Sequence, residues 1–465
     1  MIEQKKNLQL KRGRLKAALV PLYLEMYDRV APDLRSSLAP MAVRVAEILH
    51  GMADVKVLPI VSTQEDVRRM KDACGEADCV ITLHLAYSPS LLTAHELAGM
   101  HKPILILDTT FDRGFDAMSG DYLLKNHGIH GVMDFAAVLR SLGAAYTVCA
   151  GYYRDESFIE KLERSVKTIH AALRYKNQTI GITGKPFQMM GDFAVDFTLL
   201  FEKFSHNVVE ISEEDILQAM DEADGREALA FFEKEVSDFG FDGDGESLKT
   251  NIRQYLAFGD LFAKQGITAY TMNFDDFYKT PVPFYAVNNM MKNGVGYAGE
   301  GDVLTASLGP ALNTFSEKAA FSEFFCPDWD RGLLLMSHMG EADPRFAKEG
   351  SRVHLKEKTA LGKSVSSYYY EFEAQPMELT FATWTKNPGG ALRLLTGRLD
   401  CVSHPVFKEL GAPHFVVQPG RKLDEFLTEY SMNGGGHHLY VAQGDQKREM
   451  EMFASLIGVD FCFME

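Results

Sequence analysis

The sequence predicts an α/β protein with two doubly wound Rossmann-like domains followed by a β-rich, barrel-like C-terminal domain. Apolar strands alternate with amphipathic helices through the first third of the chain, which indicates a parallel sheet covered on both faces. A second strand–helix segment follows. After about residue 325 the pattern changes to short β-type runs separated by Gly, Pro and Asn, which is typical of an antiparallel sheet or barrel. We therefore expect domains at 1–177, 178–324 and 325–465.

The apolar pattern of the first domain predicts its elements one by one. They are a strand at 15–24, a helix at 38–52 ended by glycine, a strand at 54–61, a helix at 63–74 opened by a Thr cap, a strand at 78–87, a helix at 88–100, a strand at 102–110 and a closing helix at 156–177.

The rest of the chain is predicted in the same way. In the central domain we expect strands at 179–184, 208–212, 267–274 and 295–301, several acidic helices, and a helix at 283–294. In the C-terminal domain we expect β-type runs at 354–362, 366–373, 377–385, 390–403 and 413–420.

Composition excludes several classes of partner. The net charge of −16 argues against nucleic acid as a partner, because phosphate binding needs a basic surface. A cationic ligand such as a metal suits this charge better. No apolar run is long enough for a membrane span, so we expect no membrane partner. Six scattered cysteines are typical of reduced thiols, and the basic N-terminus is interpreted as a lead-in to the first strand rather than a signal peptide. We therefore expect a cytoplasmic protein.

Five polar residues stand where a ligand would be expected to bind. In "GVGYAGEGD", Glu300 follows an apolar strand, and His338 ends the apolar run in "RGLLLMSHMGE". Ligands of open α/β sheets bind beyond the carboxyl ends of strands, so both side chains should project into such a crevice. Glu323 lies among aromatic residues in "AAFSEFFCPDW", and "NGGGHHLYVAQG" supplies His437 and His438 beside three glycines.

Two carboxylates and two imidazoles form a mixed oxygen and nitrogen ligand set. Such a set suits an octahedral divalent ion such as manganese, with positions left for substrate oxygens. The glycines beside these residues allow backbone and substrate to come close. The positions of the cysteines exclude an all-thiolate zinc site.

Each of these residues also has a purely structural interpretation. Glu300 could cap the helix that begins near Val303, and Glu323 could lie beside a partner or on a helix face. His338 could be a satisfied core histidine, and "GGGHH" could be a turn into an edge strand. These spacings match no established metal motif, so the alternatives remain open at this point.

Several of these segments also occur, in the same order, in one known family. "NGVGYAGEGDVLTASL", "AAFSEFF", "LLLMSHMGE" and "GGGHHLYV" resemble the L-arabinose isomerase family within the L-fucose/L-arabinose isomerase-like superfamily. "PFYAVNNMMKNG" and "NHGIHGVMDFAAVLRSLG" extend the similarity in patches from about residue 120 to residue 445.

The resemblance implies a fold, a cofactor and an assembly. It implies α/β N-terminal and central domains, a barrel-like C-terminal domain, and a trimer or hexamer with sites between subunits. It also implies residue roles in sugar metabolism: manganese ligands Glu300, Glu323, His338 and His438, and substrate-binding residues His130, His127 and His437. His130 stands where the family has an active-site histidine contributed across a subunit contact.

This sequence departs from the family pattern in its N-terminal third. The "GSQxLYG"-type segment is absent and the first strand reads "VPLYLEMYDRVAPD". His127 replaces a glutamine, and the chain is shorter than typical members. The absent segment and His127 fall in the region that recognises the sugar, so the resemblance implies the reaction rather than one particular aldose.

The implied reaction is aldose–ketose isomerisation. A proton moves between C2 and C1 of an open-chain sugar through a cis-enediol, with Glu300 and Glu323 as acid and base and Asp302 as a supporting group. The residues favour proton transfer over a hydride shift because two carboxylates flank the site. Alternatives are a fucose-type isomerase or an epimerase on the same scaffold, or a non-catalytic sugar-binding sensor. A nucleotide-dependent dehydrogenase is disfavoured, since no G-x-G-x-x-G follows the first strand.

Overall fold

The computed structural model describes residues 13–115, 118–359 and 365–465, which divide into two compact units, 13–173 and 174–465. The lead-in predicted for residues 1–12 and the end of the run predicted at 354–362 lie outside the described residues. Among the residues described, none of the helices has both the length and the apolar character that crossing a membrane requires.

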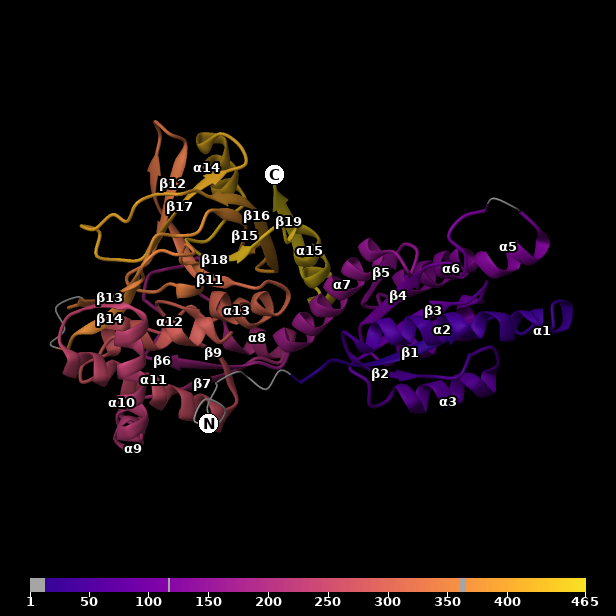
Figure 1. The fold of residues 1–465 in the computed structure, drawn as a ribbon, viewed down its shortest axis with the longest axis horizontal. Coiled ribbons are helices and arrows are strands. Elements are labelled where there is room, and N and C mark those ends of the chain that lie inside the picture. Colours follow the sequence, from indigo (N-terminus) through magenta and orange to yellow (C-terminus); the bar gives the residue numbers. More distant parts are fainter. Residues whose placement is uncertain (1–12, 116–117, 360–364) are drawn as a thin grey trace. The chain divides into compact units, whose positions relative to one another are not determined.

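The first unit is built on a five-stranded parallel sheet of order β2-β1-β3-β4-β5 (Figure 1). This confirms the predicted doubly wound domain. Its strands are β1 (Lys16–Leu22), β2 (Asp54–Val57), β3 (Cys79–His84), β4 (Ile104–Asp108) and β5 (Tyr146–Ala150). Its helices are α1 (Tyr27–Val30), α2 (Leu34–His50), α3 (Gln64–Cys74), η1 (Ser90–Leu92), α4 (Ala94–Ala98), α5 (Gly120–Asn126) and α6 (Gly128–Ser141), and α7 (Glu156–Tyr175) follows.

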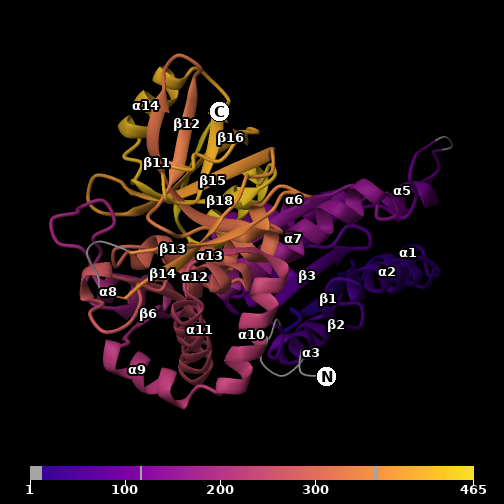
Figure 2. The ribbon, with the colours of Figure 1, turned by 60° about the vertical axis from the view of Figure 1, so that its left-hand side comes forward.

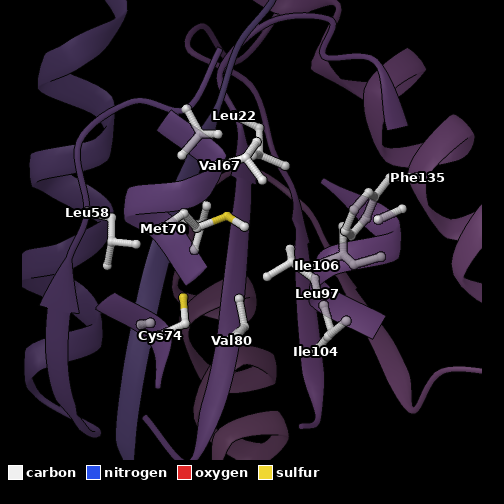
Figure 3. Close-up of a cluster of buried hydrophobic side chains, with 14 of the residues drawn as sticks. Leu22, Leu58, Val67, Met70, Cys74, Val80, Leu97, Ile104, Ile106 and Phe135 are labelled. Atoms are coloured by element: carbon white, nitrogen blue, oxygen red, sulfur yellow. The ribbon is translucent and has the colours of Figure 1, made fainter. Parts of the chain in front are cut away.

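The core of this unit forms where helices cover one face of the sheet. Figure 3 shows Met70 of α3 and Phe135 of α6 among the buried side chains that pack on Val80 of β3 and Ile106 of β4. All six residues of β3 are buried, as a strand covered on both faces requires. Thr63 caps α3 through a reciprocal capping box, so the predicted start of that helix is confirmed.

The second unit begins with a four-stranded parallel sheet of order β10-β9-β6-β7. Its strands are β6 (Thr179–Thr183), β7 (Asn207–Glu210), β9 (Ile267–Met272) and β10 (Gly296–Ala298). The helices are α8 (Phe197–Phe204), α9 (Glu213–Glu222), α10 (Gly225–Asp238), α11 (Gly245–Gln265), η2 (Phe274–Asp276), α12 (Phe284–Lys292) and α13 (Val303–Phe315). The buried helix α13 contacts β9 and β10 as well as strands of the following barrel (Figure 1).

The C-terminal region contains a closed barrel of six antiparallel strands, which confirms the predicted barrel-like domain. The strands follow the order β15-β18-β11-β12-β17-β16, and β16 pairs back onto β15. They are β11 (Ala319–Asp328), β12 (Leu333–Ser337), β15 (Met377–Lys386), β16 (Leu392–Cys401), β17 (His414–Pro419) and β18 (His438–Gln443), with β19 (Asp460–Met464) parallel to β16. Figure 2 labels β11, β12, β15, β16 and β18 of this barrel.

Some features of the fold were not predicted from the sequence. β13 (His354–Lys358) and β14 (Ser367–Glu371) lie within the β-type runs predicted at 354–362 and 366–373, but they do not join the barrel and instead form a small sheet with the unpredicted strand β8 (Gly240–Asp242). The short helix η3 (Pro344–Phe346) and the helices α14 (Leu423–Met432) and α15 (Lys447–Ile457) also lie in the β-rich region. A three-residue strand has no periodicity of its own and is recognised only by its partner.

Candidate active site

Strand pairing in the barrel brings the predicted site residues of the second unit together. Glu323 lies on β11, where it is paired with Ser337 of β12 on one side and with His438 of β18 on the other. His338 directly follows β12, and Glu300 lies on the loop between β10 and α13. The residues therefore come from four separate segments that meet at one end of the barrel. Glu323 is a strand residue, so its interpretation as a residue on a helix face is wrong.

The functional atoms of these side chains converge within hydrogen-bonding or near-bonding distances. Glu323 Oε1 lies 3.2 Å from His438 Nε2, 3.7 Å from His338 Nε2 and 3.7 Å from His437 Nε2. Glu300 Oε2 lies 3.5 Å from His437 Nε2 and 3.6 Å from His438 Nε2. Five of the seven predicted site residues thus form one cluster, which we call the five-residue centre.

A carboxylate holds the Nδ1 atom of each histidine in the centre. His338 Nδ1 lies 2.7 Å from Glu341, and His438 Nδ1 lies 2.9 Å from Asp302. His437 Nδ1 lies 2.6 Å from Asp192. An ionised carboxylate only accepts hydrogen bonds, so each Nδ1 donates. The Nε2 atoms of His437 and His438 then face both glutamates, and that of His338 faces Glu323. This arrangement is typical of imidazoles that bind metals.

Sequence reasoning missed two of these three carboxylates. Glu341 stands three residues after His338 within the quoted "HMGE" segment, so its position offered a weak signal. Glu341 Oε1 accepts a 2.7 Å hydrogen bond from the buried Tyr297 hydroxyl, and Gly340 N donates to Oε2, the oxygen that holds His338. Asp192 offered no signal, because it lies far from His437 in the chain.

The glycines around Glu300 are required by close contacts. A Cβ at Gly299 would lie 2.8 Å from the His338 ring, and a Cβ at Gly301 would lie 2.4 Å from the Pro186 backbone. Glu300 itself has φ of 61°, an uncommon conformation for a residue with a side chain. The backbone is therefore bent to bring the Glu300 carboxylate into the centre.

Asp302, not Glu300, caps the helix that follows. One oxygen of Asp302 accepts a 2.8 Å hydrogen bond from Thr305 N at the start of α13, and the other contacts His438. The interpretation of Glu300 as the helix cap is therefore wrong, and its carboxylate is left for other partners. The fully buried Asp302 links the helix rigidly to His438.

Aromatic rings enclose the centre and limit access of water. The edge of Phe321 lies against the rings of His338 and His438, at centroid distances of 5.0 and 4.9 Å. Phe193 stacks on His438, with a centroid distance of 5.1 Å and planes inclined by 9°. The surroundings are therefore apolar, and interactions between charges are stronger there than in water.

The charges of the centre shift the pKa values of its members. Burial alone would lower the pKa of His438, but Asp302 and Glu323 outweigh burial and raise it to about 9. Burial is likewise outweighed at His437, where Asp192 and Glu300 raise the pKa to about 10. Burial would raise the pKa of Glu300, but the neighbouring histidines lower it overall. Without a metal, His437 and His438 therefore keep their protons at neutral pH, and Glu300 is ionised beside them.

The residues fit a divalent cation. Two groups of side chains have ligand atoms within 4.8 Å of one another: Glu300, His437 and His438, and Glu323, His338 and His438. The buried His438 Nε2 makes no hydrogen bond of acceptable geometry, although it faces the glutamates. A cation would satisfy this atom and take the place of protons on the imidazoles.

His127 and His130, the other two predicted site residues, lie in the first unit. His127 Nε2 lies 2.7 Å from the Tyr27 hydroxyl and Nδ1 lies 3.1 Å from Leu124 O, so both ring nitrogens are occupied. Burial lowers the pKa of His127 despite its hydrogen bonds to backbone carbonyls. His130 is exposed on the first turn of α6, and its ring lies edge-on to His127.

Comparisons with known proteins point to the same family along most of the chain. Residues 34–177 match the L-arabinose isomerase N-terminal domain, residues 190–318 the L-arabinose isomerase central domain, and residues 318–460 the L-arabinose isomerase C-terminal domain. The chain is 25% identical to the L-arabinose isomerase of Levilactobacillus brevis, over 83% of this chain and 84% of the relative. It is 25% identical to that of Pediococcus pentosaceus (89% and 92%) and 22% identical to that of Erwinia tasmaniensis (87% and 85%).

These matches cover all three domains in order, and their layout agrees with the two parallel sheets and the barrel of the structure. The chain therefore belongs to the L-arabinose isomerase family and is an aldose–ketose isomerase.

Proposed function

We propose that this protein is a manganese-dependent isomerase that converts an aldose of the L-arabinose type into its ketose. The observation that carries the proposal is the convergence of Glu300, Glu323 and three imidazoles, each imidazole held at Nδ1 by a carboxylate. The relatives are L-arabinose isomerases, which supports this class of sugar.

Glu300, Glu323, His338 and His438 would hold the cation. Oxygen and nitrogen donors of this kind suit manganese, and four protein ligands leave positions on an octahedral ion for the substrate. When bound, the cation supplies Lewis-acid polarisation of the sugar's O1 and O2. The partly exposed His437 is assigned to the substrate, since it is the most accessible imidazole of the centre.

The two glutamates carry the proton chemistry. One carboxylate removes the proton from C2, the electrons move into the C1 carbonyl to form a cis-enediol, and the proton is delivered to C1. The second carboxylate accepts the proton of the O2 hydroxyl group and gives a proton to O1, so that O2 becomes the carbonyl oxygen of the ketose and O1 a hydroxyl group. The lowered pKa of Glu300 keeps that carboxylate ionised and able to accept a proton at neutral pH.

We further propose a homo-oligomer, a trimer or hexamer, in which His130 and His127 reach the site of a neighbouring subunit. Exposed apolar side chains on α1, α5 and α6 and directly before α1 support such a contact, since His127 lies between α5 and α6 and His130 on α6: Met26, Val30, Leu123, Ile129 and Met133. The six free cysteines support a reducing compartment, so we assign the protein to the cytoplasm.

The Tyr27–His127 hydrogen bond favours a related sugar as a second candidate substrate. His127 stands where the family has a glutamine. Its hydrogen bonds to Tyr27 and to Leu124 O leave neither ring nitrogen free for a sugar hydroxyl. A fucose-type isomerase or an epimerase on the same scaffold would have the same centre with different groups around the far end of the sugar.

The test is a ketose assay on chelator-stripped protein with pentoses, hexoses and 6-deoxyhexoses, with and without added manganese. We expect manganese-dependent ketose formation, and its loss by about 1,000-fold or more in Glu300→Gln. Glu317→Gln, which changes an exposed carboxylate before β11, is the matched control and should retain activity. Bound manganese without ketose from any sugar would favour an epimerase, and sugar binding that is independent of metal would favour a sensor.

Solvent labelling separates the two possible mechanisms. In heavy water, proton transfer through the enediol places some deuterium at C1 of the product, whereas a hydride shift places none. We expect deuterium at C1, because two carboxylates lie beside the substrate position.

A further inference from the structure

Segment 184–196, between β6 and α8, packs against the five-residue centre without forming a helix or strand. Phe187 N donates a 2.8 Å hydrogen bond to Glu300 O, and Phe193 stacks on His438. Lys386 donates a hydrogen bond to Ala194 O. The segment is therefore fixed to the centre and to the end of β15, while Met189 between these points is fully exposed with φ of 71°.

Asp192 makes the polar side-chain contact between this segment and a histidine of the centre. Its Oδ2 accepts two hydrogen bonds from His437, from Nδ1 at 2.6 Å and from the backbone N at 2.9 Å. Burial would raise the pKa of the Asp192 carboxyl, but the His437 hydrogen bonds hold it well below its usual range. The contact therefore fixes both the backbone and the ring of His437.

The three carboxylates that hold imidazoles differ in how they are supported. Asp302 and Glu341 have fully buried side chains and are anchored by the α13 cap and by Tyr297. The side chain of Asp192 is 32% exposed and sits on a segment without regular structure. His437 thus depends on the packing of segment 184–196, whereas His338 and His438 depend on the rigid core.

We propose that Asp192 is a positioning residue that aims His437 Nε2 at the substrate side of the centre. Without its carboxylate the His437 ring can rotate, and Nε2 leaves its place beside Glu300 and Glu323. The proposal rests on the proposed function in one respect, the assignment of His437 to the substrate. It predicts that Asp192 affects catalysis through His437 and leaves the metal ligands in place.

The test compares Asp192→Asn with Asp196→Asn. Both variants neutralise a carboxylate of the same segment, but Asp196 only caps α8 through Thr198 N. We expect kcat/KM to fall by about 10- to 100-fold in Asp192→Asn and to remain within about twofold of wild type in Asp196→Asn. The dissociation constant for manganese should change by less than about threefold in both.

A double-variant cycle then tests whether Asp192 acts through His437. In a His437→Gln background, adding Asp192→Asn should lower kcat/KM by less than about twofold more, because the two residues act as one unit. Additive losses would overturn the proposal, and so would equal effects in the two asparagine variants. A tenfold loss of manganese affinity in Asp192→Asn would also overturn it, since Asp192 would then act through the metal.

Crystal structures of the two asparagine variants give a readout independent of activity. In Asp196→Asn, His437 Nε2 should stay beside Glu300 Oε2, as in the present structure at 3.5 Å. In Asp192→Asn the ring should turn away, and an unchanged ring would overturn the proposal. If the wild-type protein isomerises no sugar, the proposed function fails, and these structures still decide whether Asp192 positions His437.

Discussion

Metal binding at the five-residue centre should compete with protons. The pKa of His438 is raised to about 9 and that of His338 is also raised, because the attraction of neighbouring carboxylates outweighs burial. Both imidazoles therefore carry a proton in the metal-free protein at pH 6. A cation can bind Nε2 only when that proton has left, so the apparent metal affinity must rise with pH.

The size of this pH dependence follows from the raised pKa of His438. At pH 7, removing the proton from His438 costs about 3 kcal/mol, since each pH unit below the pKa is worth about 1.4 kcal/mol. The apparent association constant for manganese should rise about tenfold per pH unit up to pH 9. The slope should be steeper at the acidic end of the range, below the raised pKa of His338, because metal binding there must also release the proton of that imidazole.

Titration calorimetry at pH 6.5, 7.5 and 8.5, each in two buffers of different ionisation enthalpy, measures both the affinity and the number of protons released. His438→Gln should lose affinity and release one proton fewer. His95→Gln, which changes an exposed histidine on α4, should behave as wild type. An affinity that is flat between pH 6.5 and 8.5 would refute the reasoning.

Three further predictions concern a carboxylate that holds a histidine, a glycine in a tight loop and a buried histidine of the first unit. Glu341→Gln should weaken manganese binding by about 10- to 100-fold in the same titration, and an unchanged affinity would show that the carboxylate is dispensable. Gly301→Ala should lower the free energy of unfolding in urea by more than about 2 kcal/mol, because the new side chain meets both a backbone φ of 81° and a clash with Pro186. Gly434→Ala is the control, since Gly434 has a similar φ of 71° but open space around it, and it should lower the free energy of unfolding by less. Equal losses in the two variants would contradict the clash. Burial lowers the pKa of His84 to about 3, so the unfolded chain binds one more proton below pH 6.5. Between pH 6.5 and 5 the unfolding free energy of wild type should therefore fall by about 2 kcal/mol more than that of His84→Asn, and parallel pH profiles would contradict this.

Much of the fold could be predicted from local patterns in the sequence. Apolar strands such as 78–87 alternate with capped helices such as 63–74, and each pattern reports the environment of its own element. The same patterns indicated the change to a barrel after residue 325. The strand β8 could not be predicted, because three residues carry too little periodicity and its pairing with β13 depends on a distant segment.

The types of residue in the centre were also visible in the sequence. Glycines on both sides of Glu300 predicted a close approach of backbone and ligand, and the structure places Gly299 against His338. Adjacent His437 and His438 indicated imidazole ligands. What each residue touches was not visible: Asp302 both caps α13 and holds His438, whereas the sequence allowed Glu300 to be the cap.

By itself, the sequence determined the parallel α/β layers, the presence of a barrel and the chemical character of the centre, because periodicity and side-chain chemistry are properties of neighbouring residues. Only the tertiary structure decided that Glu323 lies opposite His438 across β11 and β18, and that Asp192 holds His437. The physical reason is that a contact between distant segments depends on strand register and on the packing of the whole barrel, and shifting one strand by one residue would turn Glu323 to the other face of the sheet.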